Sequence, residues 1–112
     1  MKKNSHFIKV SNICYYFNSE GIVCGKAEGN YIVLHLTDNR TLKVHIGMTE
    51  FLASMGNPPE LFRSHRSSFV NLVHVTGLDE ANGQVMMNNK MLLCIAEQNY
   101  AAFHQAMNCS EI

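Results

Sequence analysis

The chain has 112 residues, of which nine are Lys or Arg and nine are Asp or Glu, so its formal net charge is zero. This length allows one domain, and a hydrophobic fraction of 46% with a charged fraction of 16% is typical of a globular chain and excludes a disordered one. Proteins that bind nucleic acid or anionic membranes without regard to sequence are usually strongly basic, so the neutral balance argues against that class. No apolar run approaches the roughly 20 residues that a membrane helix needs.

Strand patterns dominate the first half of the chain. Residues 7–10 and 22–27 are short strand candidates, whereas residues 13–17 fit either a strand or a helical turn. Residues 31–36 and 41–46 each alternate between apolar and polar side chains. The Asp38-Asn39 pair between them tolerates left-handed turn geometry, so a β-hairpin is predicted. A helix is expected next, because Met48, Phe51, Leu52 and Met55 have helical spacing before Gly56 and Pro58-Pro59.

The second half of the chain also combines short predicted strands with one predicted helix. Strands are expected at 61–63 and 73–78, with a second hairpin that joins 84–87 to 91–95. A helix is expected from about Gln98 to Met107, with Phe103, Ala106 and Met107 as its packing stripe. The predicted fold class is therefore all-β with short helices, built from small packed antiparallel sheets.

The titratable residues do not form an enzyme or metal site. The six histidines include no His-x-x-x-His pair and no Glu-x-x-His pair, so surface or packing roles are favoured over metal binding. The four cysteines are irregularly spaced without a Cys-x-x-Cys pair, which favours reduced thiols in a cytoplasm over a zinc site. There is no glycine-rich phosphate loop and no nucleophile elbow. We therefore expect no catalytic residues, no metal and no cofactor.

The segment 60–72 differs from the rest of the chain. Two of the three arginines, Arg63 and Arg66, flank His65 here, and an arginine fork fits phosphates and guanine edges. Residues 1–66 hold eight of the nine Lys and Arg but five of the nine acids, a local charge of +3, which leaves −3 for the remainder. An anionic partner would meet the first part of the chain.

Polar side chains continue this segment. A helical turn starting at Ser67 or Ser68 would be capped by a hydroxyl and would offer N–H groups to a phosphate. Asn71 carries the donor and acceptor that pair with adenine, or that fix a loop internally. The same residues also fit a short strand that leads into a capped turn with solvated arginines. The residues alone leave both interpretations open.

The sequence LFRSHRSSFVNL at 61–72, followed by VHV and then GLD at 77–79, resembles the signature of the LytTR DNA-binding domain. That signature is an aromatic-Arg-x-His-Arg-Ser-x-apolar-Val-Asn block, an apolar strand and a hairpin. ICYYF at 13–17 resembles the family's early apolar-aromatic segment, and AEGNYI at 27–32 resembles its glycine-containing loop. The resemblance covers about residues 7–107.

The resemblance implies a bacterial transcription regulator of LytTR fold that binds double-stranded DNA with loops rather than with a recognition helix. The first loop would lie near Lys26, the second at 64–71 and the third at 96–99. The residues that the resemblance places at the DNA are Lys26, Asn30, Arg63, His65, Arg66, Ser67, Asn71 and Gln98. Of these, Asn71 is the candidate for a base contact in the second loop.

The third loop departs from the family pattern. Members typically have a Ser and a basic residue there, whereas this chain has Ala96, Glu97 and Gln98. Glu97 would repel phosphate unless it accepts from a cytosine amino group, and Gln98 is able to pair with adenine. The alternative function is therefore a non-catalytic protein-interaction module with a LytTR-like fold that has lost DNA binding.

The resemblance also sets expectations about context. Members are usually joined to a receiver domain, so this chain is either a stand-alone regulator or a fragment of a longer one. Met1 and the polar lead after it suit a natural start. We expect a single domain over residues 1–112 with a core at about 7–107, located in the cytoplasm, with weak homodimerisation on repeated DNA sites.

Overall fold

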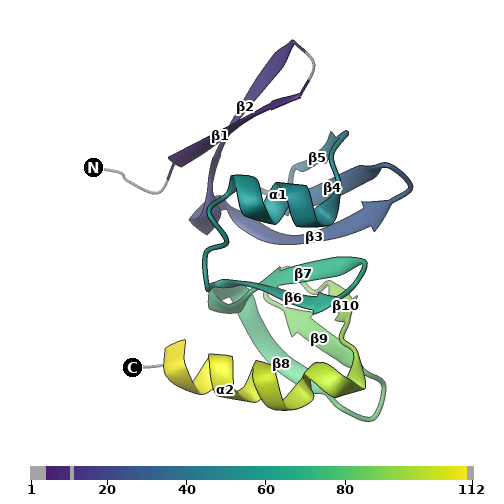
Figure 1. Ribbon diagram of the computed structural model, residues 1–112. Coiled ribbons are helices and arrows are strands. Elements are labelled where there is room, and N and C mark those ends of the chain that lie inside the picture. The colour runs from purple at the N-terminus through teal and green to yellow at the C-terminus, as the bar shows by residue number, and fades with distance from the viewer. Residues whose placement is uncertain (1–4, 11, 111–112) are drawn as a thin grey trace.

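The computed structural model describes residues 5–10 and 12–110, which form three antiparallel sheets and two α-helices (Figure 1). The mostly-β fold with short helices is therefore confirmed. The strands are β1 (Ser5–Val10), β2 (Ile13–Asn18), β3 (Ile22–Glu28), β4 (Tyr31–Leu36), β5 (Thr41–Val44), β6 (Leu61–His65), β7 (Ser68–Asn71), β8 (Val75–Asp79), β9 (Gln84–Met87) and β10 (Leu92–Cys94), and the helices are α1 (Met48–Ser54) and α2 (Tyr100–Ser110). Short 3-10 turns form at Ser19–Gly21, Leu72–His74 and Glu97–Asn99.

A five-stranded sheet in the order β5-β4-β3-β7-β6 separates two hydrophobic clusters. On one face Ile32, Leu34 and Val44 are fully buried with Phe51 of α1. On the other face Val70 packs with residues of β9, β10 and α2. Figure 1 shows α1 on one side of this sheet, and β8, β9, β10 and α2 on the other. Residues 22–25 of β3 and all four residues of β7 are buried. Since alternate side chains of a strand enter opposite faces, these segments are covered on both faces.

The two predicted hairpins are confirmed. β4 pairs with β5 so that Leu34 lies opposite Leu42, and Asn39 in the connecting turn has a φ of 69°, in the left-handed region that the sequence predicts. β9 pairs with β10 in the three-stranded sheet β10-β9-β8. Its turn places Lys90 at a φ of 73°.

The N-terminal hairpin of β1 and β2 forms a two-stranded sheet of its own. Residues 13–17, which the sequence left between strand and helix, belong to strand β2 because they pair with β1 throughout. Ile8 and Phe17 are buried in the cluster beneath α1, where the ring of Phe17 meets Phe51 edge-on with centroids 5.8 Å apart. Figure 1 shows the far end of the hairpin projecting from the sheets.

Helix α2 covers the second cluster. Phe103 is buried edge-on against Phe62, with ring centroids 5.6 Å apart, and Ala106 and Met107 are partly buried beside it, as predicted. The helix begins at Tyr100 rather than Gln98, because residues 97–99 form a 3-10 turn. In the part of the chain that the structure describes, neither helix is long and apolar enough to cross a membrane.

The helical turn predicted at Ser67 or Ser68 is wrong. Residues 68–71 are strand β7, whose four side chains are all buried, and β7 pairs with both β3 and β6. Ladder bonds on both sides and apolar cover on both faces outweigh the local capping preference of serine. The helical turn comes later, at Leu72–His74, and Asn71 caps it by accepting from the N–H of Val73. For the same reason β8 begins at Val75 and not at Val73.

Gly25 in β3 is predicted to admit no side chain. A Cβ there would lie 2.3 Å from Cε2 of Phe69, whose buried ring stacks on Phe51. We expect Gly25→Ala to lower the free energy of unfolding by about 1–3 kcal/mol, because overpacking forces buried rings to move. Urea denaturation measures this change.

The matched control is Gly21→Ala, where a Cβ would have open space around it. It should change the free energy of unfolding by less than about 0.5 kcal/mol. Equal stability of the two variants would contradict this account of the packing at β3.

Candidate nucleic-acid interface

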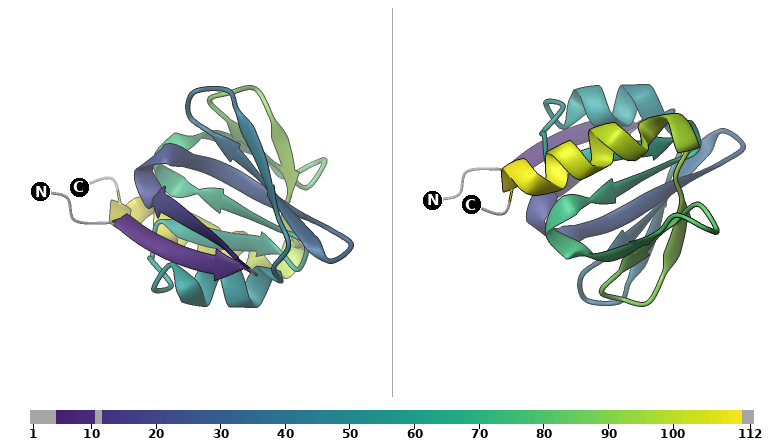
Figure 2. Two further views of the ribbon diagram at one scale, coloured as in Figure 1. Left: turned by 90° about the horizontal axis from the view of Figure 1, so that it is seen from above. Right: turned by 90° about the horizontal axis from the view of Figure 1, so that it is seen from below.

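Three loops meet at one end of the molecule: residues 26–31, 63–67 and 95–99, here called the three-loop end. The N–H of Ala27 donates to the carbonyl of Ser67 at 2.8 Å, which joins the first loop to the second. The N–H of Ala96 donates to the carbonyl of Ser64 at 3.0 Å, which joins the third loop to the second. Figures 1 and 2 show the β3–β4 turn, the β6–β7 turn and the start of α2 on the same side of the molecule. The loops that the resemblance implies are thus neighbours in space.

The first loop presents Lys26 and Asn30, both exposed. Lys26 lies opposite Ser68 of β7 on one side and Val33 of β4 on the other, so two ladders fix its backbone. The turn itself passes through Gly29 at a φ of 60°. Within residues 5–10 and 12–110, neither side chain forms a hydrogen bond or an ion pair with another residue.

The pKa of a histidine beside the first loop, His35, is lowered. Burial lowers the pKa of His35, the charge of Lys26 lowers it further, and Glu28 raises it. His35 is therefore harder to protonate than an exposed histidine, which limits the positive charge it adds near Lys26.

The second loop orients His65 through Ser67. The N–H of Ser67 donates to Nδ1 of His65 at 3.2 Å, and the Ser67 hydroxyl lies 2.9 Å from the same nitrogen. Because Nδ1 accepts, the neutral ring carries its proton on Nε2. No hydrogen bond among the described residues uses Nε2, so His65 keeps one donor for an outside partner.

The two arginines of the second loop differ in their surroundings. Arg63 donates to the hydroxyl of Thr49 and to the carbonyl of Arg66, each at 2.8 Å. The side chain of Arg66 is exposed and makes no hydrogen bond or ion pair with any residue that the structure describes. Arg66 is therefore the cation of this loop that an anion meets without displacing an internal contact.

Asn71 does not reach the surface, so its prediction as a base contact is wrong. Its side chain is fully buried, and Nδ2 donates to the carbonyls of Ser19 and Ile22, each at 2.9 Å. Its Oδ1 accepts from the N–H of Val73 at 3.0 Å. Every hydrogen-bonding group of the amide is directed inside, which is the internal role that the sequence had left open.

The third loop exposes Glu97 and Gln98 and is anchored by the half-buried Asn99. Asn99 donates from Nδ2 to the carbonyl of Ser64 at 2.9 Å, and its N–H donates to the carbonyl of Ala96 at 2.8 Å. Sequence reasoning missed this role of Asn99, because no local pattern connects it to a residue 35 positions earlier. The anchor fixes the 3-10 turn that carries the two exposed side chains.

The charge of the three-loop end is small. The three loops hold three cations, Lys26, Arg63 and Arg66, and two acids, Glu28 and Glu97. Lys43 of the neighbouring strand β5 lies 3.9 Å from Glu28 and offsets part of its charge. Such a surface suits a few positioned contacts rather than binding by charge alone.

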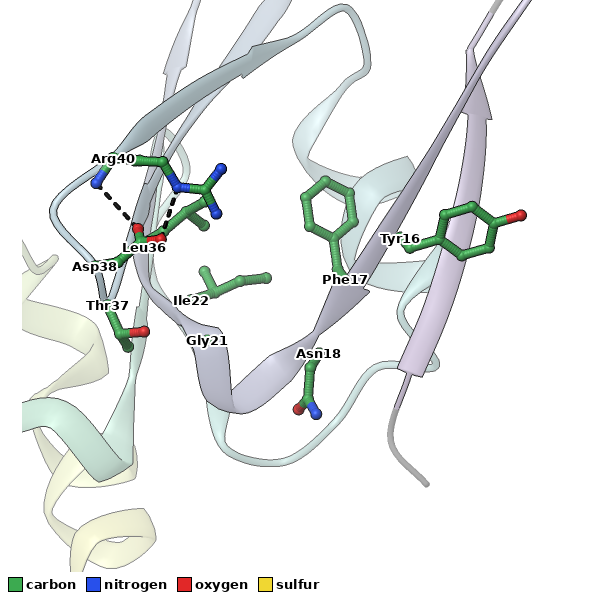
Figure 3. A pocket seen from close by; sticks show the side chains of 9 residues that line it. All are labelled: Tyr16, Phe17, Asn18, Gly21, Ile22, Leu36, Thr37, Asp38 and Arg40. Atoms are coloured by element: carbon green, nitrogen blue, oxygen red, sulfur yellow. Dashed lines mark hydrogen bonds and ion pairs between the residues drawn. The ribbon is translucent and has the colours of Figure 1, made fainter. Parts of the chain in front are cut away.

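The pocket shown in Figure 3 lies at the opposite end of β3 and β4, where Ile22 faces Leu36. It encloses about 170 Å³, and its rim carries an ion pair between Arg40 and Asp38 at 2.7 Å. The hydrogen bond from Arg40 lowers the pKa of Asp38. The described residues contain no group of three or more His, Cys, Asp or Glu side chains suited to a metal ion.

Replacement of Asn71 is expected to act on stability. Asn71→Ala would remove one donor from each of the carbonyls of Ser19 and Ile22 and the acceptor of the Val73 N–H, so the free energy of unfolding should fall by about 2–4 kcal/mol. Urea denaturation measures the loss, with the exposed Asn82→Ala as a control that should change it by less than about 1 kcal/mol. A variant as stable as the wild type that has lost only DNA binding would restore Asn71 as a base contact.

Comparison with known proteins agrees with this geometry. The profile of the LytTr DNA-binding domain family matches residues 3–108, which leaves no room for a receiver domain within the 112 residues. A similar solved structure is the LytTr DNA-binding domain of a protein described as a methyl-accepting/DNA response regulator from Bacillus cereus. It has 14% sequence identity and a TM-score of 0.70, over 95% of this chain and 98% of that one. No protein of curated function matches the chain. The chain belongs to the LytTR DNA-binding domain family, whose members are DNA-binding and not catalytic.

Proposed function

We propose that this chain is a sequence-specific regulator of transcription that reads double-stranded DNA through the three-loop end. Membership of a DNA-binding family supplies the class of ligand. The observation that carries the proposal is the meeting of three loops that are joined by backbone hydrogen bonds. Each loop presents exposed polar side chains that make no hydrogen bond or ion pair with any residue the structure describes. A surface held in this way binds at low entropic cost, because its loops are ordered before DNA arrives.

The helices are poorly suited to reading DNA, which favours the loops. Neither α1 nor α2 carries a Lys or Arg. Helix α1 buries Phe51 and Leu52, and α2 buries Phe103, so both helices serve the hydrophobic clusters. A recognition helix normally presents basic and amide side chains to the major groove.

Each loop has a distinct role in the proposed complex. Lys26 and Arg66 bind phosphates, and His65 donates from Nε2 to a phosphate or a base. Asn30 and Gln98 have amide groups that suit base edges, with Gln98 placed to pair with adenine. Ser67 acts chiefly by holding His65.

The setting of the protein follows from this function. One domain of 112 residues makes few contacts, so we expect two copies to bind repeated sites, with weak association between them. A regulator of bacterial transcription acts where the chromosome lies, which is the cytoplasm.

A second candidate is a protein-interaction module, and one surface feature favours it. Met86 and Leu92 lie opposite each other on the outer face of β9 and β10, with exposed fractions of 42% and 51%. Glu97 within the three-loop end also disfavours DNA. If the wild-type protein selected no duplex from a random pool yet formed a stoichiometric complex with a protein partner, this candidate would replace the first.

Arg66→Ala should weaken binding to a duplex selected by the wild-type protein from a random-sequence pool. The plot of log affinity against log salt should become shallower by about one ion, because one phosphate contact is lost. Fluorescence anisotropy at several salt concentrations measures both effects. Arg40→Ala is the matched control, since Arg40 is exposed but lies at the opposite end with Asp38 as its partner. An identical salt slope in the wild type and Arg66→Ala would contradict the assignment.

Glu97→Gln should strengthen binding by about threefold at low salt, because it removes a charge that repels phosphate. The same titration on the selected duplex and on an unrelated duplex measures the gain, which should occur with both. Glu20→Gln, an exposed change near the opposite end, should have no effect. Weaker binding to the selected duplex alone would instead mean that Glu97 accepts a hydrogen bond from a cytosine amino group.

A further inference from the structure

We propose that Arg63 is a positioning residue that holds the β6–β7 turn, and with it Arg66, in the geometry that binds DNA. The inference rests on the proposed function and assigns Arg63 a different role from a direct phosphate ligand. Its side chain donates hydrogen bonds to Thr49, in the first turn of α1, and to the backbone of Arg66.

The guanidinium of Arg63 links helix α1 to the β6–β7 turn. Nη1 donates to Oγ1 of Thr49 at 2.8 Å, and Nη2 donates to the carbonyl of Arg66 at 2.8 Å. Helix α1 is a firm support, because Phe51 and Leu52 bury its inner face. The planar fork of an arginine fits two acceptors at a fixed angle, whereas a lysine presents a single ammonium group.

The backbone near Arg63 needs such a support. The pairing of β6 with β7 is irregular between Phe62 and His65, so the regular ladder is interrupted just before the turn. The carbonyl of Ser67 is held by the N–H of Ala27, and the carbonyl of Arg66 is held by Arg63. Both carbonyls of the turn therefore have fixed donors, and the exposed side chain of Arg66 extends from a backbone held in one position.

The competing role for Arg63 is direct binding of a phosphate through its remaining N–H groups. The two roles predict different effects of Arg63→Lys. A phosphate ligand keeps its charge in Arg63→Lys, whereas the link between Thr49 and Arg66 is lost. The two roles also predict different effects of replacing Thr49. Thr49 is uncharged, and in the positioning role it acts on DNA binding only through Arg63.

The experiment is a double-mutant cycle on the full 112-residue chain with the duplex that the wild type selects from a random pool. Thr49→Val should weaken binding about fivefold, which corresponds to the loss of one ordinary hydrogen bond, and Thr49→Ser should keep wild-type affinity. In an Arg66→Ala background, Thr49→Val should cause no further loss. Arg63→Lys should weaken binding as much as Arg63→Gln does.

Other results would overturn the inference. Wild-type affinity in Arg63→Lys with weakened binding in Arg63→Gln would make Arg63 a phosphate ligand. An equal effect of Thr49→Val with and without Arg66 would mean that it acts through the fold, and urea denaturation of each variant would show the accompanying loss of stability. If the wild type selects no duplex from the pool, the proposed function is overturned as well. If it selects a duplex but Thr49→Val and Arg66→Ala have independent effects on affinity, only the positioning role is overturned.

Discussion

The burial of strand β7 on both faces and both edges is the constraint on which the rest of the structure depends. It pairs with β3 and β6, and Phe69 and Val70 enter different hydrophobic clusters. Asn71 at its end is accommodated inside because its amide is bonded to three backbone groups. The turn that carries Arg66 leads directly into this strand, so the rigidity of the core extends to the proposed DNA surface.

Hydrogen bonds around Ser64 connect β6 and β7 to the third loop. The buried hydroxyl of Ser64 lies 3.1 Å from the hydroxyl of Ser68, which in turn donates to the carbonyl of Cys94 at 3.2 Å. Its carbonyl accepts from Ala96 and from Asn99. A neutral chain gains little from long-range attraction, so contacts fixed in advance by such bonds are the more effective route to specific binding.

Much of the fold follows from local patterns. The hairpins of β4 with β5 and of β9 with β10 were predictable because alternation and turn residues act over neighbouring positions. Residues 68–71 were not, because a strand buried on both faces shows no alternation and its serine resembles a helix cap. The start of α2 differed for a related reason, since Asn99 is held by Ser64 in a 3-10 turn.

The sequence by itself determined the family, the fold class and which polar residues lie at the second loop, because these depend on residue types and short spacings. Only the tertiary structure decided which of them are available to a ligand. Arg63 is bonded to a residue 14 positions away and Asn71 to one 52 positions away, whereas Arg66 makes no such bond among the described residues. A side chain's availability depends on the hydrogen-bond partners that folding brings to it, and those partners come from distant segments whose approach no local pattern records.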